Sequence, residues 1–153
     1  MQYNERITEK FSFKSNHMVT QLEFDLSEMP RGFHLITSEI IKKAGILPEK
    51  GIMNILLKHT SAALTINENA DPDVRHDMQS FINELVPESH SLYIHSLEGL
   101  DDMPAHIKAS LFGPSLTIPI SSHRLNLGTW QGIYLCEFRN HGGPRKIVLT
   151  IMS

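Results

Sequence analysis

The hydrophobic pattern changes abruptly at Asp71-Pro72, and this change constrains the fold more than any other stretch. Before it, residues 62–67 alternate between two sides, as in a half-buried β-strand. Asp71 is a good N-cap and Pro72 fits the first helical position. After it, apolar residues recur at helical spacing until Pro87 stops the run. We therefore expect a strand followed at once by a helix with the apolar face Val74, Met78, Phe81, Ile82 and Leu85.

The segments before this junction predict strands and one short helix. Extended portions within residues 7–26 favour an opening hairpin. Met29-Pro30-Arg31-Gly32 breaks that pattern, and Thr37 then caps a helix that Gly45 ends. From Gly51, the sequence IMNILLKH is typical of a buried strand that runs into His59.

The segments after the junction predict a third helix and a set of strands. Residues 88–102 form a long irregular connection, which is typical of a functional loop. Asp101 or Asp102 caps the third helix, Ile107 and Leu111 form its apolar face, and Gly113 ends it. The remaining sequence predicts strands at 116–120, 125–127, 132–138 and 146–151. This order indicates a single α+β domain over residues 1–153, with a mainly antiparallel sheet or sandwich and about three helices.

Composition excludes several classes of function. Lys plus Arg is 14 and Asp plus Glu is 17, so the net charge is −3, and no basic run favours nucleic acid as a partner. The single cysteine, Cys136, excludes an intramolecular disulfide and a multi-cysteine zinc site. No apolar run approaches the roughly 18 residues of a membrane span, and the N-terminus lacks an apolar signal core. We therefore expect a cytoplasmic protein with no membrane contact.

The first group of polar residues is His59-Thr60-Ser61. The imidazole is a metal ligand or a base, and the two hydroxyls bind an anion such as phosphate. The alternative is structural, with His59 hydrogen-bonded at a strand end and the hydroxyls satisfying a turn. Asn67 and Glu68 lie at the other end of the following strand, so they reach His59 only if the chain bends or a second subunit intervenes.

The second group surrounds the start of the third helix and comprises His95, Glu98, Gly99, Asp101, Asp102 and His106. Imidazole with carboxylate ligands suits zinc or another transition metal. Carboxylates with water would instead suit magnesium that holds a diphosphate, and the sequence leaves both open. Taken singly, a loop histidine is exposed and the aspartates serve as caps.

The third group, residues 128–132, carries the only tryptophan in the chain. Trp130 stacks against a heterocyclic ligand or packs in the core or a subunit interface. Gln131 orients a ligand. Glu137 is either an inward-facing acid or solvated on an edge strand. Near the hairpin ends lie Arg124, Arg139 and Arg145, which bind phosphate or are solvated.

Three segments, HTSAALTINENADPDVR, EGLDDMPAHIKASLFGPSLTIPI and LNLGTWQGIYLCEF, together resemble the YjbQ family, which is known as secondary thiamine-phosphate synthases. The resemblance implies an α+β fold and a homotrimer with sites near subunit boundaries. It also implies a weak thiamine-phosphate synthase activity. The family pattern falls on His59, Thr60, Ser61, Asn67, Glu68, Asp71, His95, Glu98, Gly99, His106, Trp130 and Gln131.

The resemblance and the polar groups together predict a transferase that joins a hydroxymethylpyrimidine diphosphate to a thiazole phosphate and releases diphosphate. A divalent ion, magnesium or zinc, would neutralise the leaving group. One alternative is a metal-dependent binding protein for a phosphorylated or heterocyclic metabolite, with incidental catalysis, and another is that the histidines are structural. The expected roles are metal ligation by His59, His106, Glu98 and Asp101, phosphate binding by Thr60 and Ser61, substrate binding by Trp130, and catalysis by His59, Glu68, Asn67, His95, His106 and Gln131.

Overall fold

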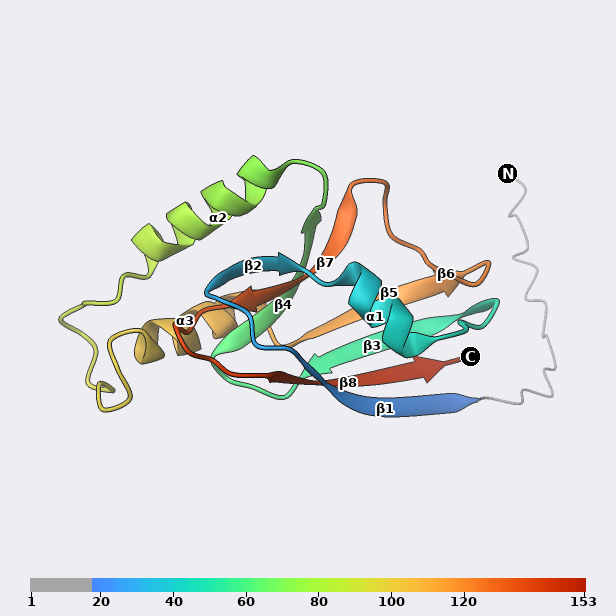
Figure 1. Cartoon of the computed structure of the whole chain (residues 1–153), viewed down its shortest axis with the longest axis horizontal. Helices are drawn as coiled ribbons and strands as arrows, with labels where there is room; N and C mark the ends of the chain where they lie inside the picture. Colours follow the sequence, from blue (N-terminus) through green and yellow to red (C-terminus); the bar gives the residue numbers. More distant parts are fainter. Residues whose placement is uncertain (1–17) are drawn as a thin grey trace, which may run out of the picture.

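The computed structural model describes residues 18–153, which fold into two antiparallel sheets and three helices (Figure 1). The larger sheet has the order β1-β8-β3-β5-β6, with β1 (Val19–Leu26), β3 (Lys50–Leu57), β5 (Ser115–Ser121), β6 (Arg124–Leu125) and β8 (Arg145–Met152). The smaller sheet has the order β2-β7-β4, with β2 (Gly32–Leu35), β4 (Ala62–Glu68) and β7 (Gln131–Glu137). The helices are α1 (Thr37–Ala44), α2 (Pro72–Leu85) and α3 (Asp102–Phe112). The expected α+β, mainly antiparallel fold is confirmed.

Strand β7 forms the centre of the smaller sheet and is buried on both faces. Ile133 and Leu135 belong to the main core, which fills the space between the two sheets. Cys136 packs on the other side in a second core with Ala105 and Ala109 of α3. The smaller sheet is therefore a middle layer between the larger sheet and α3, which explains why β7 has almost no polar face.

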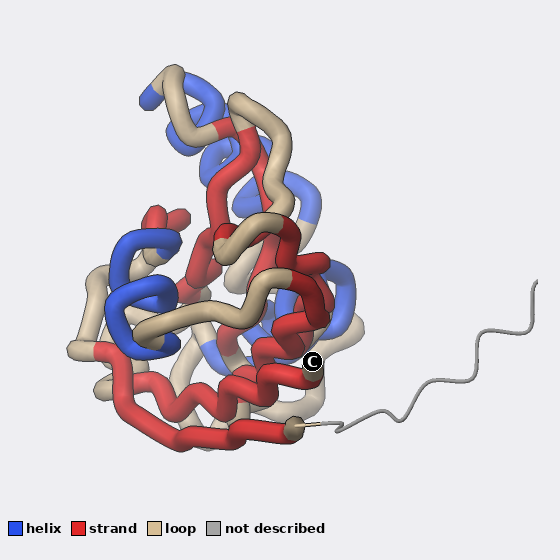
Figure 2. The backbone as a smooth tube through the Cα atoms, turned by 90° about the vertical axis from the view of Figure 1, so that its right-hand side faces the viewer, coloured by secondary structure: helices blue, strands red, loops and turns tan. Residues whose placement is uncertain are grey.

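The turn at residues 140–144 connects two strands that do not pair with each other. β7 pairs with β2 and β4 in the smaller sheet, whereas β8 belongs to the larger sheet and pairs with β1 and β3. Glu137 at the end of β7 and Arg145 at the start of β8 nevertheless meet. At the other end of β8, Ser153 and Met18 exchange two backbone hydrogen bonds, so the C-terminus lies beside the start of the described chain (Figure 2).

Three details near the start of the chain differ from the sequence expectation. The first arm of the predicted hairpin lies outside the described residues, and the second arm, β1, pairs with β8. The sequence does not predict β2, because Met29-Pro30-Arg31-Gly32 is typical of a break. Thr37 is the first residue of α1 and not its cap, since its hydroxyl accepts a hydrogen bond from the Ile133 amide at 2.8 Å.

Helix α2 begins as expected but buries little of its apolar face. The Asp71 carboxylate accepts a hydrogen bond from the Asp73 amide, so the predicted N-cap is confirmed. Ile82 is buried, whereas Phe81 is 67% exposed and Leu85 is 58% exposed. None of the helices within residues 18–153 has the length and hydropathy needed to span a membrane.

The buried face of helix α3 is not the face that carries Ile107 and Leu111, which the sequence predicts to be buried. Leu111 is 61% exposed, and the buried residues include Asp102 and Lys108. The Lys108 ammonium donates a hydrogen bond to Asn83 Oδ1 at 2.7 Å, and Arg31 donates to the same oxygen at 2.9 Å. A buried hydrogen bond between Lys108 and Asn83 thus joins α3 to α2, in addition to the apolar cluster that Ile82 shares with Ala105 and Ala109.

Burial, together with the nearby charge of Arg31, lowers the pKa of Lys108 from 10.5 to about 8. The folded state therefore binds this proton more weakly than the unfolded state, and stability rises with pH between these two values. We expect the free energy of unfolding to increase by up to about 3 kcal/mol over this interval, relative to the Lys108→Met variant. Urea unfolding of both proteins across this pH range measures the difference, and parallel pH profiles would contradict it.

Candidate functional site

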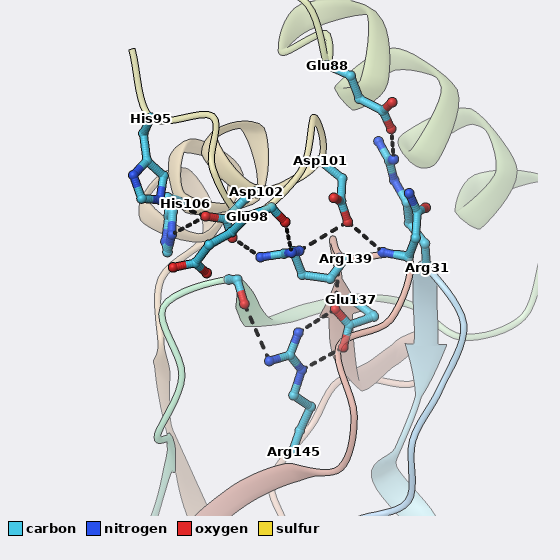
Figure 3. Close-up of polar contacts among 12 residues, drawn as sticks. Arg31, Glu88, His95, Glu98, Asp101, Asp102, His106, Glu137, Arg139 and Arg145 are labelled. Atoms are coloured by element: carbon cyan, nitrogen blue, oxygen red, sulfur yellow. Dashed lines mark hydrogen bonds and ion pairs between the residues drawn. The ribbon is translucent and has the colours of Figure 1, made fainter. Parts of the chain in front are cut away.

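Three side chains with metal-binding atoms converge at the start of α3, and we name them the His–Asp cluster: His95, Asp102 and His106. Asp102 and His106 are four residues apart on one face of α3, while His95 comes from the loop of residues 86–101. Asp102 Oδ2 lies 2.7 Å from His95 Nε2 and 3.5 Å from His106 Nε2. Figure 3 shows the three side chains turned toward one another, and one potential ligand atom from each lies within 4.8 Å of the others.

The hydrogen bond of His106 fixes which of its nitrogens is free. Nδ1 lies 3.0 Å from the carbonyl oxygen of Thr60. A carbonyl can only accept, so Nδ1 carries a proton, and Nε2, which faces Asp102, is the nitrogen that the neutral ring would offer to a metal. A histidine that donates its second N–H to a backbone carbonyl is the usual arrangement for a metal ligand. Two imidazoles with one carboxylate are a donor set suited to zinc and related transition metals.

The Arg139 guanidinium contacts the cluster through Asp102 and also binds the neighbouring Asp101. Its Nη1 forms an ion pair with Asp102 Oδ1, and its Nε donates to Asp101 Oδ2 at 3.0 Å. The Asn140 amide donates to the same Asp101 oxygen at 2.8 Å. Burial acts to raise the pKa of Asp101, but the Asn140 amide and the Arg139 charge outweigh it and hold that pKa below its ordinary value. Asp101 is thus an ionised partner of Arg139.

His59 has a different environment from the one its expected role requires. Its Nε2 accepts a hydrogen bond from the Lys146 amide at 2.8 Å, and its Nδ1 lies 3.3 Å from Arg145 Nη1. Burial and then the charge of Arg145 lower the pKa of His59, so the ring is neutral. The Lys146 amide takes the Nε2 lone pair, so the neutral ring carries its proton on Nδ1, and this agrees with the structural alternative for a strand-end histidine.

A buried ion pair lies behind His59. Arg145 donates two hydrogen bonds of 2.6 Å to the Glu137 carboxylate, and neither side chain is more than 4% exposed. The remaining Arg145 nitrogen, Nη1, lies 3.4 Å from Ser61 Oγ. Glu137 also accepts from the Arg139 amide at 2.9 Å. Of the two alternatives for Glu137, the inward-facing acid is therefore correct, and Arg145 is not a solvated hairpin charge.

A cavity of about 230 Å³ adjoins the cluster on the His106 side. Its volume suits a small metabolite. Hydroxyls of Thr60 and Ser110 and the ring of His106 give it polar groups next to an apolar wall. The lining residues are His59, Thr60, Ala62, His106, Ala109, Ser110 and Pro114.

Within one chain, the residues predicted around Trp130 lie far from the cluster. The β4–β7 register pairs Ala62 with Glu137 at one end and Glu68 with Gln131 at the other. Six residues of strand separate these ends, which corresponds to ~20 Å. At the far end, the Asn67 side chain accepts from the Glu68 amide, the Gln131 side chain accepts from the Gly128 amide, and Trp130 is 64% exposed.

The expected ligand set and the cluster share one member. Of His59, Glu98, Asp101 and His106, only His106 lies in the cluster, and His95 and Asp102 complete it. Asp101 is occupied by Arg139 and Asn140, and the Glu98 carbonyl accepts from Arg139. The four-residue spacing of Asp102 and His106 is a sequence signal that favours Asp102 over Asp101. Arg139 has no comparable local signal, because its partners are distant in sequence.

Comparison with known proteins gives consistent matches. Residues 22–153 match the family described as UPF0047 protein YjbQ-like. The UPF0047 protein YjbQ of Salmonella typhimurium is 56% identical over 135 residues, which cover 87% of this chain and 97% of that protein. A solved YbjQ-like protein of unknown function from Sulfolobus solfataricus P2 is similar with a TM-score of 0.76 and 28% identity, covering 90% and 99% of the two chains. A solved protein of the YjbQ/UPF0047 family from Clostridium acetobutylicum is similar with a TM-score of 0.73 and 38% identity, and the match covers 85% of this chain and 98% of that one.

These matches confirm the resemblance and correct the function that it implied. The relatives from Salmonella typhimurium and Synechocystis are named only as UPF0047 proteins, and the Sulfolobus protein is described as one of unknown function. The expectation of a thiamine-phosphate synthase-like transferase that releases diphosphate is therefore wrong, since none of these names carries that activity.

Gly142 provides a test of the buried ion pair. A Cβ at this position would fall 2.7 Å from both Glu137 carboxylate oxygens and closer still to Arg145 Nη2. We expect Gly142→Ala to lower the free energy of unfolding by about 2 kcal/mol, because the pair must shift within a packed environment. Chemical denaturation measures this. The exposed neighbour variant His141→Ala serves as control, and equal stabilities of the two variants would contradict the prediction.

Proposed function

The chain belongs to the UPF0047 YjbQ-like family, and from its own site we propose that it is a metal-dependent enzyme acting on a small phosphorylated metabolite. The His–Asp cluster would hold one divalent transition metal ion, with zinc as the best match to two imidazoles and a carboxylate. The observation that carries the proposal is the orientation of His106, whose Nδ1 is bonded to the Thr60 carbonyl while Nε2 faces Asp102. This donor set favours zinc over magnesium, which prefers oxygen ligands.

The adjoining cavity supports the choice of ligand. Thr60 and Ser110 line it, and the Thr60 hydroxyl is a suitable donor to phosphate oxygens, whereas the Ser110 hydroxyl already donates to the His106 carbonyl at 2.9 Å. Arg145 is committed to Glu137, so most of the positive charge for an anionic ligand would come from the metal. When bound, such an ion acts as a Lewis acid that polarises a ligand oxygen. The residues of this chain would orient the ligand: Thr60 by a hydrogen bond, and Ala62, Ala109 and Pro114 by the apolar wall.

We expect His106→Ala and Asp102→Asn each to lower zinc affinity by at least about 10-fold, because each removes or weakens one of three ligands. His59→Ala should keep the affinity of the wild type while losing stability, since His59 bonds the Lys146 amide outside the cluster. Isothermal titration with zinc after chelator treatment measures the affinities. Loss of zinc binding in His59→Ala, with retention in Asp102→Asn, would support the ligand set expected from the sequence instead.

The exposed apolar residues of the loop of residues 86–101 support assembly with further copies of this chain. Leu92 is 79% exposed, Ile94 97% and Leu97 99%, and the same loop carries His95 of the cluster. Apolar side chains gathered at such exposure are typical of protein interfaces. We propose a homotrimer in which a neighbouring copy covers this loop, so that the site lies near a subunit boundary and Trp130 of one copy can approach the cluster of another.

The double variant Ile94→Asp/Leu97→Asp should lower the molar mass measured by light scattering to that of one chain, because charges at the interface oppose association. Ile46→Asp is the matched control, since Ile46 is equally exposed, at 98%, in the connection between α1 and β3. A wild-type protein with the mass of a single chain would refute the assembly.

A further inference from the structure

The two oxygens of Asp102 face different partners, and this division points to a role for Arg139 that builds on the proposed metal site. Oδ2 faces His95 and His106, whereas Oδ1 is taken by Arg139 Nη1 (Figure 3). Asp102 is 1% exposed, so water does not compete for either oxygen. We propose that Arg139 is a positioning residue that restricts Asp102 to a single metal-directed oxygen and thereby sets the coordination and affinity of the metal.

Arg139 is itself held in place from three sides. Its Nε donates to Asp101 Oδ2 at 3.0 Å, and its Nη2 donates to the Glu98 carbonyl at 2.9 Å. Its backbone amide donates to Glu137 at 2.9 Å, which ties the start of the side chain to the buried ion pair. The planar guanidinium satisfies these side-chain acceptors and Asp102 at once, with different nitrogens. A lysine has a single nitrogen and cannot reach all of them.

The charges around Arg139 support positioning over simple neutralisation. Asp101 and Asp102 place two carboxylates on one guanidinium, so Asp101 already offsets the positive charge that would otherwise oppose a metal cation. The contribution specific to Arg139 is the orientation of the Asp102 carboxylate, because its Nη1 holds Oδ1 and leaves Oδ2 toward the histidines. Without the guanidinium, Oδ1 would be a buried carboxylate oxygen without a partner, and the carboxylate would be free to rotate. Outer residues of this kind commonly change metal affinity by about 10- to 100-fold.

The test uses the full chain and Co²⁺ alone as the probe, because the visible absorption spectrum of Co²⁺ reports its coordination. Arg139→Gln should weaken Co²⁺ binding by about 10- to 100-fold and change the spectrum of the bound ion. Arg139→Lys, which keeps the positive charge but loses the planar set of guanidinium donors, should show the same changed spectrum. Asp101→Asn keeps an acceptor for Nε and should show a smaller loss than Arg139→Gln. Arg124→Gln, an exposed substitution in β6, should match the wild type.

The outcomes separate the two proposals. A wild type that binds no Co²⁺ overturns the metal site itself. A wild type that binds Co²⁺, together with Arg139→Gln and Arg139→Lys that share its spectrum and affinity, overturns the positioning role alone. If Arg139→Lys restores the wild-type spectrum, charge and not direction is the contribution, which also overturns the inference. Should Arg139→Gln fail to fold by circular dichroism, the Arg139→Lys and Asp101→Asn spectra decide between the same outcomes.

Discussion

The buried Glu137–Arg145 ion pair is the contact on which the arrangement of the site depends. It joins the end of β7 in the middle layer to the start of β8 in the larger sheet, where the chain passes from one sheet to the other. Removing two charges from water costs several kcal/mol for each ion, and this cost is offset only when the two ions and their neighbours satisfy nearly all of their hydrogen bonds. Here the carboxylate accepts from both the guanidinium and the Arg139 amide. His59 and Arg139 therefore take their positions from the same pair, one on each side of it.

Much of the local structure is predictable from the sequence, because the signals for it are local. Strands β3 and β4 follow from alternation or from a short buried run, and α2 follows from helical spacing with the Asp71 cap. Gly113 ends α3 where the sequence indicates, and Cys136 packs as a small apolar side chain. Each of these features depends on residues within about four positions of one another, and the antiparallel α+β class follows from their order.

The pairing of distant residues accounts for what the sequence does not predict. The short β2 depends on β7 for its hydrogen bonds and has a breaking motif before it. The four-residue spacing to His106 favours Asp102 over Asp101, but only the side of α3 that faces the sheet decides the choice, since adjacent helical residues differ by about 100° around the axis. The β4–β7 register places Glu68 and Gln131 at the end of the strands opposite His59. His59 and Glu68, which are close together in the sequence, are therefore far apart in space. Arg139, which follows β7, meets Asp102 only because α3 packs against the smaller sheet.

The burial of α3 shows that charged residues can determine how a helix is rotated about its own axis. The large apolar residues Ile107 and Leu111 predict one inward face, whereas Asp102 and Lys108 lie inside together with the smaller residues Pro104, Ala105 and Ala109. Rotating the helix to bury its larger apolar side chains would move Asp102 and His106 away from His95 and break the hydrogen bond from Lys108 to Asn83. The polar contacts thus act as a rotational lock, and the small residues Ala105 and Ala109 make that setting sterically acceptable against the sheet. Substitutions that increase the apolar content of this helix would therefore threaten its orientation before they threaten its helicity.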